Sequence, residues 1–473
     1  METRNELDKG RLKVAAKALL ASVEVSVADN DSNIEAVVVP FVRLFEPKAK
    51  NDFIADGLTP KKQEGMILDL IRTSHKNFVT SFFARLHPII EVVVAGEAFV
   101  PPSAFLPNDD QNESEQTQTS DTSVYCLSLL KYSAMCTEAA LERTVAMNKA
   151  NDKNSQHPIQ IAPQVYEVAL QLHNVLLSLH DCGSEGIAAR NAVLSLCESW
   201  WLSNAVNRDT LIAQVLPLQV LHASDPTEFQ KSHIKKLLTF KDAFQVIDFL
   251  NPSSDSLRSL LLRIASNPMC LKVGEGRKFL ASLFRDHDLI LDLHLSFRVQ
   301  IPNASRSILQ AYAEIYHKAW CDADDASNVT TLEVLEHKVL QDLMHAAIHV
   351  ASPAMAKALL IVLEPLHKDK KDKRVADLLW RLYSPILWRS LSAANPLVRK
   401  NAVTILGKVF PLHNPTHNQV RATIESSCAA LETALQDADP RVRATASEAT
   451  ANVCALFWEA LPSSNIRMLI NRK

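Results

Sequence analysis

The sequence predicts an all-α protein, an α-solenoid of stacked helical repeats that are irregular before about residue 380 and regular after it. Three observations predict this fold class. The 473 residues include only nine glycines, about 2% against about 7% in average proteins. Apolar residues recur at helical spacing along most of the chain. Near the C-terminus, two segments align with an offset of 44 residues and no gap.

The glycine deficit and the charge balance exclude several function classes. Few glycines leave few positive φ angles for hairpins and phosphate-binding loops, and neither GxGxxG nor GxxxxGK[ST] occurs. The net charge of −3 excludes a nucleic-acid binder driven by bulk charge, although it leaves local basic patches open. The eight cysteines form no CxxC pair, so they are expected to be free thiols in a reducing compartment. We therefore expect no cofactor and no metal site.

The chain divides by composition into five parts. Residues 1–100 are predicted to form an N-terminal helical segment. Residues 101–123 contain five acidic residues and no Lys or Arg, and are predicted to be a disordered loop because they carry little apolar surface to bury. Residues 124–147 are predicted to be helical, 148–163 a polar loop, and 164–473 the solenoid itself. No run of 18 apolar residues occurs, so no membrane span is expected.

The repeat is clearest from Leu387 and from Leu431 onward. An Asn-Pro or Asp-Pro pair begins the second helix of each unit, where the first side chain caps the helix and the proline fits its first position. An apolar stripe with a small alanine follows, so neighbouring helices can approach closely. A period of 40–47 residues with two helices is typical of HEAT repeats. The residues that define the repeat are Asn395, Pro396, Val398, Arg399 and Ala402, and then Asp439, Pro440, Val442, Arg443 and Ala446.

Four aromatic blocks resemble one family in particular. The strongest runs from Leu378 to Leu391 and continues to Pro415, and the others are Tyr312–Trp320, Leu196–Trp201 and Phe457–Pro462. Together, in this order and spacing, they resemble the family of G-type HEAT-repeat subunits that are specific to the condensin-2 complex (condensin II). The likeness spans roughly residues 166–473 and is densest over 375–470.

The resemblance implies a non-catalytic scaffold subunit of condensin II that acts in mitotic chromosome condensation. Its expected partners are a kleisin subunit, the pair of structural maintenance of chromosomes (SMC) ATPases that the kleisin bridges, and chromosomal DNA, and its expected location is the nucleus and the chromosome. Family members continue well past Lys473, so a short form or a truncation is expected. The alternative function is a general HEAT-type adaptor, of the transport-receptor or phosphatase-scaffold kind, that does not bind DNA.

A basic stretch supplies the candidate DNA contacts. Between Pro365 and Lys408 lie ten Lys or Arg and three Asp, a net charge of +7. Such a patch can neutralise phosphates without reading sequence, although a solvated turn between helices would look the same. The candidate contacts are Lys368, Lys370, Lys371, Lys373, Arg374, Arg399 and Lys400.

Other conspicuous residues have a structural and a functional interpretation. Arg399 and Arg443 occupy equivalent positions, and we expect them to pair with carboxylates or helix C-termini of neighbouring repeats. Trp380, Trp388 and Trp458 are candidate hot spots for a partner, while helical spacing favours a place in the core. His345 and His349 have metal-ligand spacing but no third ligand. Asp286-His287-Asp288 is predicted to be a polar loop, and no catalytic motif is found.

Overall fold

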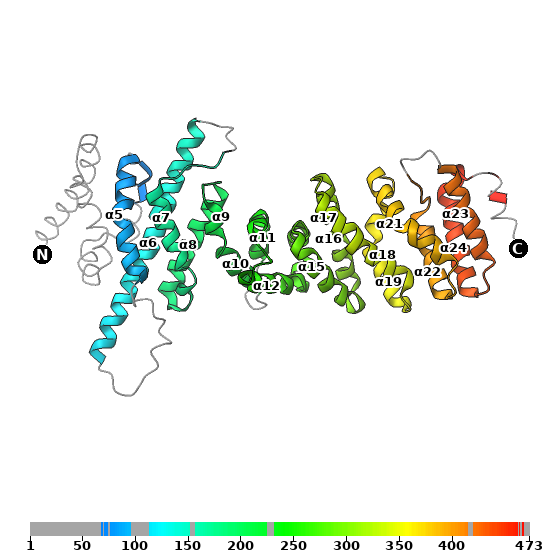
Figure 1. Ribbon diagram of the computed structural model, residues 1–473. Helices are drawn as coiled ribbons and strands as arrows, with labels where there is room; N and C mark the ends of the chain where they lie inside the picture. The colour runs from blue at the N-terminus through cyan, green and yellow to red at the C-terminus, as the bar shows by residue number, and fades with distance from the viewer. Residues whose placement is uncertain are drawn as a thin grey trace, which may run out of the picture. The chain divides into compact units, whose positions relative to one another are not determined.

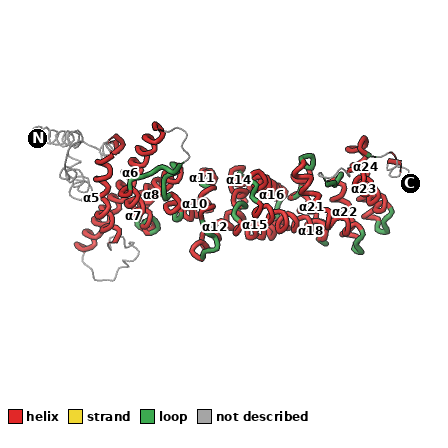
Figure 2. Tube along the Cα trace, turned by 45° about the horizontal axis from the view of Figure 1, so that its top comes forward, coloured by secondary structure: helices red, strands yellow, loops and turns green. Residues whose placement is uncertain are grey.

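The computed structural model describes residues 68–95, 113–151, 157–224, 231–414 and 420–467, apart from 70, 74, 75, 462, 464 and 465. The described residues fold as helices joined by loops, with no strand among them beyond an isolated bridge between Ile159 and Ala205 (Figures 1 and 2). The all-α prediction is confirmed. None of the described helices is long and apolar enough to cross a membrane. The chain divides into two compact units, Met1–Leu216 and Pro217–Lys473.

In unit 1, α5 packs on α7, and the long helix α6 packs on α8. Trp200 is fully buried, and its indole N–H donates to the carbonyl of Val206 at 2.9 Å. That bond fixes the turn after α8, where Asn204 and Asn207 adopt positive φ angles. From Lys76 onward, the described helices of unit 1 are α5 (Lys76–Ala95), α6 (Glu113–Asn151), α7 (Pro163–Asn174), α8 (Gly183–Leu202) and α9 (Arg208–Ile212); α10 (Val215–Ser224) leads into unit 2.

The helix boundaries of unit 1 differ from the predicted ones. Residues 113–123 belong to α6, although we expected a disordered loop through Ser123, and α6 also continues through residues 148–151 of the second predicted loop. The prolines of that first loop lie before residue 108, whereas 113–123 contain no Pro or Gly. The rest of both predicted loops lies largely outside the described residues, as does most of the predicted segment 1–100.

The boundary between the two compact units falls after residue 216 in the sequence, well after residue 164, where the solenoid was predicted to start.

Unit 2 consists of two layers of helices. Successive helices of the first layer contact one another, α12 with α15, α15 with η7, and α18 with α21; in the second layer α14 contacts α16, α16 contacts α19, and α22 contacts α24. The helices are α11 (Lys231–Thr239), α12 (Asp255–Ala265), α13 (Pro268–Lys272), α14 (Gly274–Leu283), α15 (His287–Gln300), α16 (Arg306–Asp325), α17 (Val329–Val334), the π-helical η7 (Leu335–Leu340), α18 (Gln341–His349), α19 (Pro353–Val362), α20 (Glu364–Lys368), α21 (Lys373–Leu391), α22 (Pro396–Val409), α23 (Val420–Leu435) and α24 (Pro440–Phe457).

The last two helix pairs are the regular repeats that the sequence predicts. Asn395 Oδ1 accepts from the Leu397 N–H at 2.9 Å, and Asp439 Oδ1 accepts from the Arg441 N–H at 2.8 Å. Pro396 and Pro440 then begin α22 and α24. The two helices approach closely, since a Cβ at Gly407 would lie 2.9 Å from that of Ala449.

The helices before α21 are less regular, also as predicted. Several are a single turn or two long, and a π-helical turn interrupts the element that runs from α17 into α18. The same capping chemistry nevertheless recurs there and at α21 itself. Asn267 and Asp286 cap α13 and α15, Asp372 caps α21, and each accepts from the backbone N–H two residues ahead. Capping by Asn or Asp is therefore the common device that starts these helices with few glycines.

Candidate functional site

An arginine at the fourth position of a second-layer helix links successive repeats. The Arg399 guanidinium forms a bidentate pair with the Asp437 carboxylate, at 2.6 and 2.8 Å. Its remaining nitrogen donates to the carbonyls of Ala393 and Ala394, in the turn between α21 and α22. Both charged side chains are largely buried, 17% and 10% exposed. The pair lowers the pKa of Asp437 from its usual value. Arg399 therefore holds two repeats together.

The contact with two backbone carbonyls recurs at two more arginines. Arg443 donates to the carbonyls five and six residues before it, as Arg399 does. Arg277 of α14 also donates to the carbonyls five and six residues before it, and it reaches Glu314 of α16 at 2.5 Å. We call Arg277, Arg399 and Arg443 the arginine ladder. The sequence identified two of its members and missed Arg277, whose helix begins with Gly274 in place of proline.

Three arginines of the basic stretch pair with carboxylates, most of which come from outside the stretch. Arg374 contacts Asp324 and Asp325 of α16, each at 2.8 Å. Arg381 pairs with Glu336 of η7 and with Asp377. With Arg399 bound to Asp437, the arginines at 374 and 399 are occupied internally and leave the set of candidate DNA contacts.

Lys370 also serves the fold. Its ammonium donates to the carbonyls of Lys408 and Phe410, both at 2.7 Å, and lies over the ring of Phe457. Burial lowers the pKa of Lys370 below its usual value. The lysine thus caps the C-terminus of α22, where a cation is favoured by the helix dipole. It is not free to contact DNA.

The remaining cations of the stretch lie at two separate places. Lys371 and Lys373 stand at the start of α21, close to the end of α22 where Lys408 lies. Arg389 is near the other end of α21, roughly 24 Å away at 1.5 Å per residue, and Lys400 follows it at the start of α22. Lys368 forms an exposed pair with Glu364 at 2.9 Å. The single predicted patch is therefore two smaller ones.

A buried carboxylate joins three helices beneath this region. Glu336 accepts from the indole N–H of Trp320 at 3.0 Å and is paired with Arg381. Its side chain is 8% exposed. The π-helical turn η7 carries it, and both partners satisfy its charge. This cluster connects α16, η7 and α21 and belongs to the core.

The tryptophans divide between core and surface. Trp200 and Trp201 are buried. Trp380 and Trp388 of α21 are half-buried. Trp458 is 51% exposed. Among the candidate partner hot spots, it is the most open to a partner.

The histidines and cysteines of the described residues form no metal cluster. The rings of His345 and His349 stack at 4.2 Å between centroids. Asp286 caps α15, so the predicted Asp-His-Asp loop is in part a helix start. The eight cysteines are free thiols, and burial raises the pKa of Cys197 and of Cys270 to about 12. These two thiols pack as small apolar groups and are poor nucleophiles.

Sequence comparison identifies relatives of this chain. Residues 263–414 match the family described as Condensin II non structural maintenance of chromosomes subunit. The chain is 29% identical over 301 residues to Condensin-2 complex subunit G2 of Mus musculus, and 30% identical over 288 residues to that of Danio rerio. These alignments cover 63% and 60% of this chain, and 26% and 25% of the relatives. The matched part thus spans about a quarter of each relative's length.

Solved structures of other helical-repeat proteins share only a distant likeness. A structure of microtubule polymerases with TOG domain arrays has a TM-score of 0.24 and 12% identity, covering 98% of this chain and 96% of that one. Kap121p bound to Ste12p has a TM-score of 0.22 and 11% identity, covering 95% and 59%. At this level of likeness, the description of the fold rests on the helices themselves.

The matched residues contain the two aromatic blocks at 312–320 and 378–391, together with Arg277, Arg399 and the basic stretch. The relatives and the family match agree with the resemblance that those blocks predict. Over about 60% of its length, this chain is therefore similar to Condensin-2 complex subunit G2, and its residues 263–414 match the family of Condensin II non-SMC subunits.

Proposed function

We propose that this chain is a non-catalytic scaffold subunit of condensin II in mitotic chromosome condensation, located on chromosomes in the nucleus. In this function it binds a kleisin subunit and, through it, the SMC ATPase pair. The observation that carries the proposal is the condensin II family match over residues 263–414, together with relatives from several vertebrates that all bear the same condensin-2 name.

The arrangement of unit 2 suits a scaffold. Two members of the arginine ladder, Arg277 and Arg399, each bond to a carboxylate of a following helix pair. Such charge-assisted bonds are stronger and more directional than neutral ones. Stacked repeats held in this way present a continuous surface to an extended partner. Binding and positioning are the proposed contributions of this chain, and ATP hydrolysis belongs to its SMC partners.

The test of the proposal is co-purification with the condensin II kleisin of the same organism. The two chains are co-expressed with different tags and pulled down from either side. We expect each to retain and solubilise the other. A kleisin of condensin I serves as the matched control and should be retained far less.

DNA contact is proposed where the start of α21 lies beside the end of α22. Lys371 and Lys373 of the first and Lys408 of the second are without ion-pair partners among the described residues. Reversing all three to Glu should weaken DNA binding by the kleisin-bound chain about tenfold at about 0.1 M salt, and should reduce the slope of log affinity against log salt by up to about 2.7. Fluorescence anisotropy with labelled duplex DNA measures both quantities.

The matched control reverses Lys272, Lys278 and Lys357, three exposed lysines elsewhere in unit 2. It changes the net charge equally, so it separates a local contact from bulk charge. If the two triple variants bind DNA with equal affinity at every salt concentration, the proposal that Lys371, Lys373 and Lys408 contact DNA is wrong.

A second candidate function is a general HEAT-type adaptor that does not bind DNA. The observation that favours it is the internal pairing of Arg374, Arg381 and Arg399, which removes much of the basic charge. An adaptor of this kind would not need a kleisin, so the co-purification distinguishes the two functions.

A further inference from the structure

An open apolar groove runs between α12 and α15, on the first layer of unit 2. It has a volume of about 880 Å³. The arginine ladder, the basic stretch and the tryptophans all lie outside this groove. Its lining residues are Leu262, Arg263 and Ser266 of α12, and Asp292, Leu295, Ser296, Val299 and Gln300 of α15.

α15 presents apolar side chains on two faces. One face is buried in the core, with Leu289, Leu293 and Phe297 each fully covered. On the other face, Leu291, Leu295 and Val299 are 45%, 58% and 75% exposed, at four-residue spacing. Single exposed leucines are ordinary on protein surfaces, but a stripe of three beside a groove marks a surface for a partner.

The polar groups of the groove already satisfy one another. The Ser266 and Ser296 hydroxyls lie 3.1 Å apart, and the Gln300 amide donates to the Ser266 hydroxyl and to the Ser296 carbonyl. The Gln300 carbonyl oxygen accepts from the Tyr312 hydroxyl at 2.9 Å. The floor therefore offers few hydrogen bonds to the backbone of an extended peptide, which would be left unsatisfied there. A helix brings its backbone hydrogen bonds with it.

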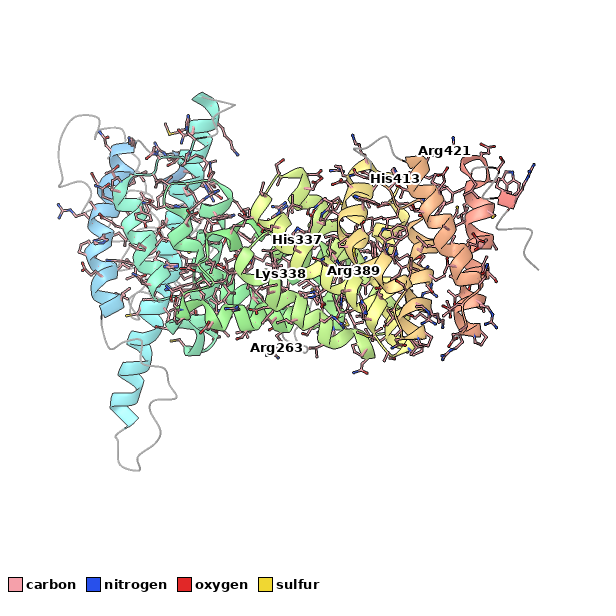
Figure 3. The ribbon with its side chains drawn as sticks, turned by 45° about the vertical axis from the view of Figure 1, so that its right-hand side comes forward. Arg263, His337, Lys338, Arg389, His413 and Arg421 are labelled. Carbon is pink, nitrogen blue, oxygen red and sulfur yellow. The ribbon has the colours of Figure 1, made fainter. Side chains whose placement is uncertain are left out.

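The charges around the groove are unbalanced. Both neighbouring carboxylates are engaged, Asp292 with Arg258, and Asp342 with Arg298 and His294. Arg263 at the rim is exposed and has no ion-pair partner among the described residues. Lys338 belongs to η7, which packs on α15 next to the groove, and it is likewise exposed and without an ion-pair partner among the described residues. Figure 3 labels both side chains, with Arg389 on the next helix of this layer.

We infer that this groove binds an acidic amphipathic α-helix of a partner protein. Two or three apolar side chains of the helix, at i, i+4 and i+8, would pack between Leu262, Leu295 and Val299, as the ridges of one helix fill the grooves of others. Carboxylates beside that apolar face would meet Arg263 and Lys338. The inference rests on the groove and its charges alone, so it holds whether or not a kleisin binds elsewhere.

A peptide of defined design tests the inference on the full chain. The probe is a fluorescein-labelled helical peptide of about 16 residues, with leucine at four-residue spacing on one face and glutamate on both flanks. The control peptide has lysine in place of each glutamate. Anisotropy titrations should show saturable binding of the glutamate peptide, at least about tenfold tighter than the lysine peptide, and weakened by salt.

Variants of the chain locate the binding. Leu295→Ser should weaken binding of the glutamate peptide about tenfold, and Arg263→Glu about fivefold. The matched control is Leu202→Ser, a leucine of α8 that is 59% exposed; it should change nothing. All three positions are exposed, so folding should be retained, and circular dichroism checks this. The proposal is overturned if the glutamate peptide does not bind, if the two peptides bind equally, or if Leu295→Ser behaves as Leu202→Ser does.

Discussion

Replacing Gly276 by alanine is expected to lower the free energy of unfolding by about 3 kcal/mol, because the new methyl group would have no room. A Cβ at this position would lie 2.2 Å from the carbonyl oxygen of Cys270 and 2.8 Å from its sulfur. Cys270 is fully buried in α13, so it cannot move aside. The only relief is a shift of α14, which would also pull Arg277 away from the carbonyls of Leu271 and Lys272.

Gly274 provides a matched control in the same helix. Its nearest neighbour to an added Cβ is an Arg277 nitrogen at 3.9 Å. Gly274→Ala should therefore leave stability unchanged or raise it by about 0.5 kcal/mol, through the lower entropy of the unfolded chain. Urea denaturation followed by circular dichroism compares the two variants. Equal stabilities would contradict the close packing of α13 on α14.

Replacing Arg399 by methionine is expected to cost about 3 kcal/mol. Methionine keeps the apolar stem but leaves the largely buried Asp437 carboxylate without its partner, and a buried charge stripped of its partner is strongly destabilising. Two backbone carbonyls lose a donor at the same time. A double-mutant cycle with Asp437→Asn isolates the pairwise free energy, which we expect to be about 2 kcal/mol.

The exposed pair of Arg421 and Glu425 provides the control for this cycle. Arg421 is 82% exposed, so Arg421→Met should cost about 0.5 kcal/mol or less.

The destabilisation caused by Arg399→Met should also become smaller at acidic pH. The pKa of Asp437 is lower in the folded chain than in the unfolded chain, where it is about 3.9. The ion pair therefore stabilises the fold fully at pH values above 3.9, and this contribution is lost as the pH falls through the folded-state pKa. A cost that is independent of pH would show that the charge of Asp437 contributes little.

The regular repeats could be predicted from the sequence because their signals are local. Asn395 and Asp439 precede prolines and cap the helices that follow, which requires no information from elsewhere in the chain. Arg277 escaped notice because its helix begins Gly-Glu-Gly-Arg and lacks that proline. The detectable signal was an arginine at the fourth helical position, which all three ladder members share.

The electrostatics of the basic stretch could not be predicted from the sequence. Counting charges along the chain gives +7 between residues 365 and 408. Arg374, Arg381 and Arg399 each pair with a carboxylate that lies 38 to 50 residues away in the sequence. The packing of distant segments decides which cations remain unpaired, and a count of charges along a short stretch of sequence cannot show this.

The groove was hidden for a related reason. α15 reads as His-Asp-Leu-Ile-Leu-Asp-Leu-His-Leu-Ser-Phe-Arg-Val-Gln, with apolar residues on two faces. A helix that is apolar on both faces is usually buried on both. Only the packing of its neighbours shows that Leu295 and Val299 are left uncovered.

Quantitative co-purification with the condensin II kleisin is the most direct test of the central claim, that this chain is a scaffold subunit of condensin II. The tagged chain is isolated from mitotic cells, and the kleisin and SMC subunits are quantified by mass spectrometry against the bait. We predict that the condensin II kleisin and both SMC subunits are recovered in amounts close to one per chain, and the condensin I kleisin in traces. Recovery of this chain without any kleisin or SMC subunit would contradict the claim.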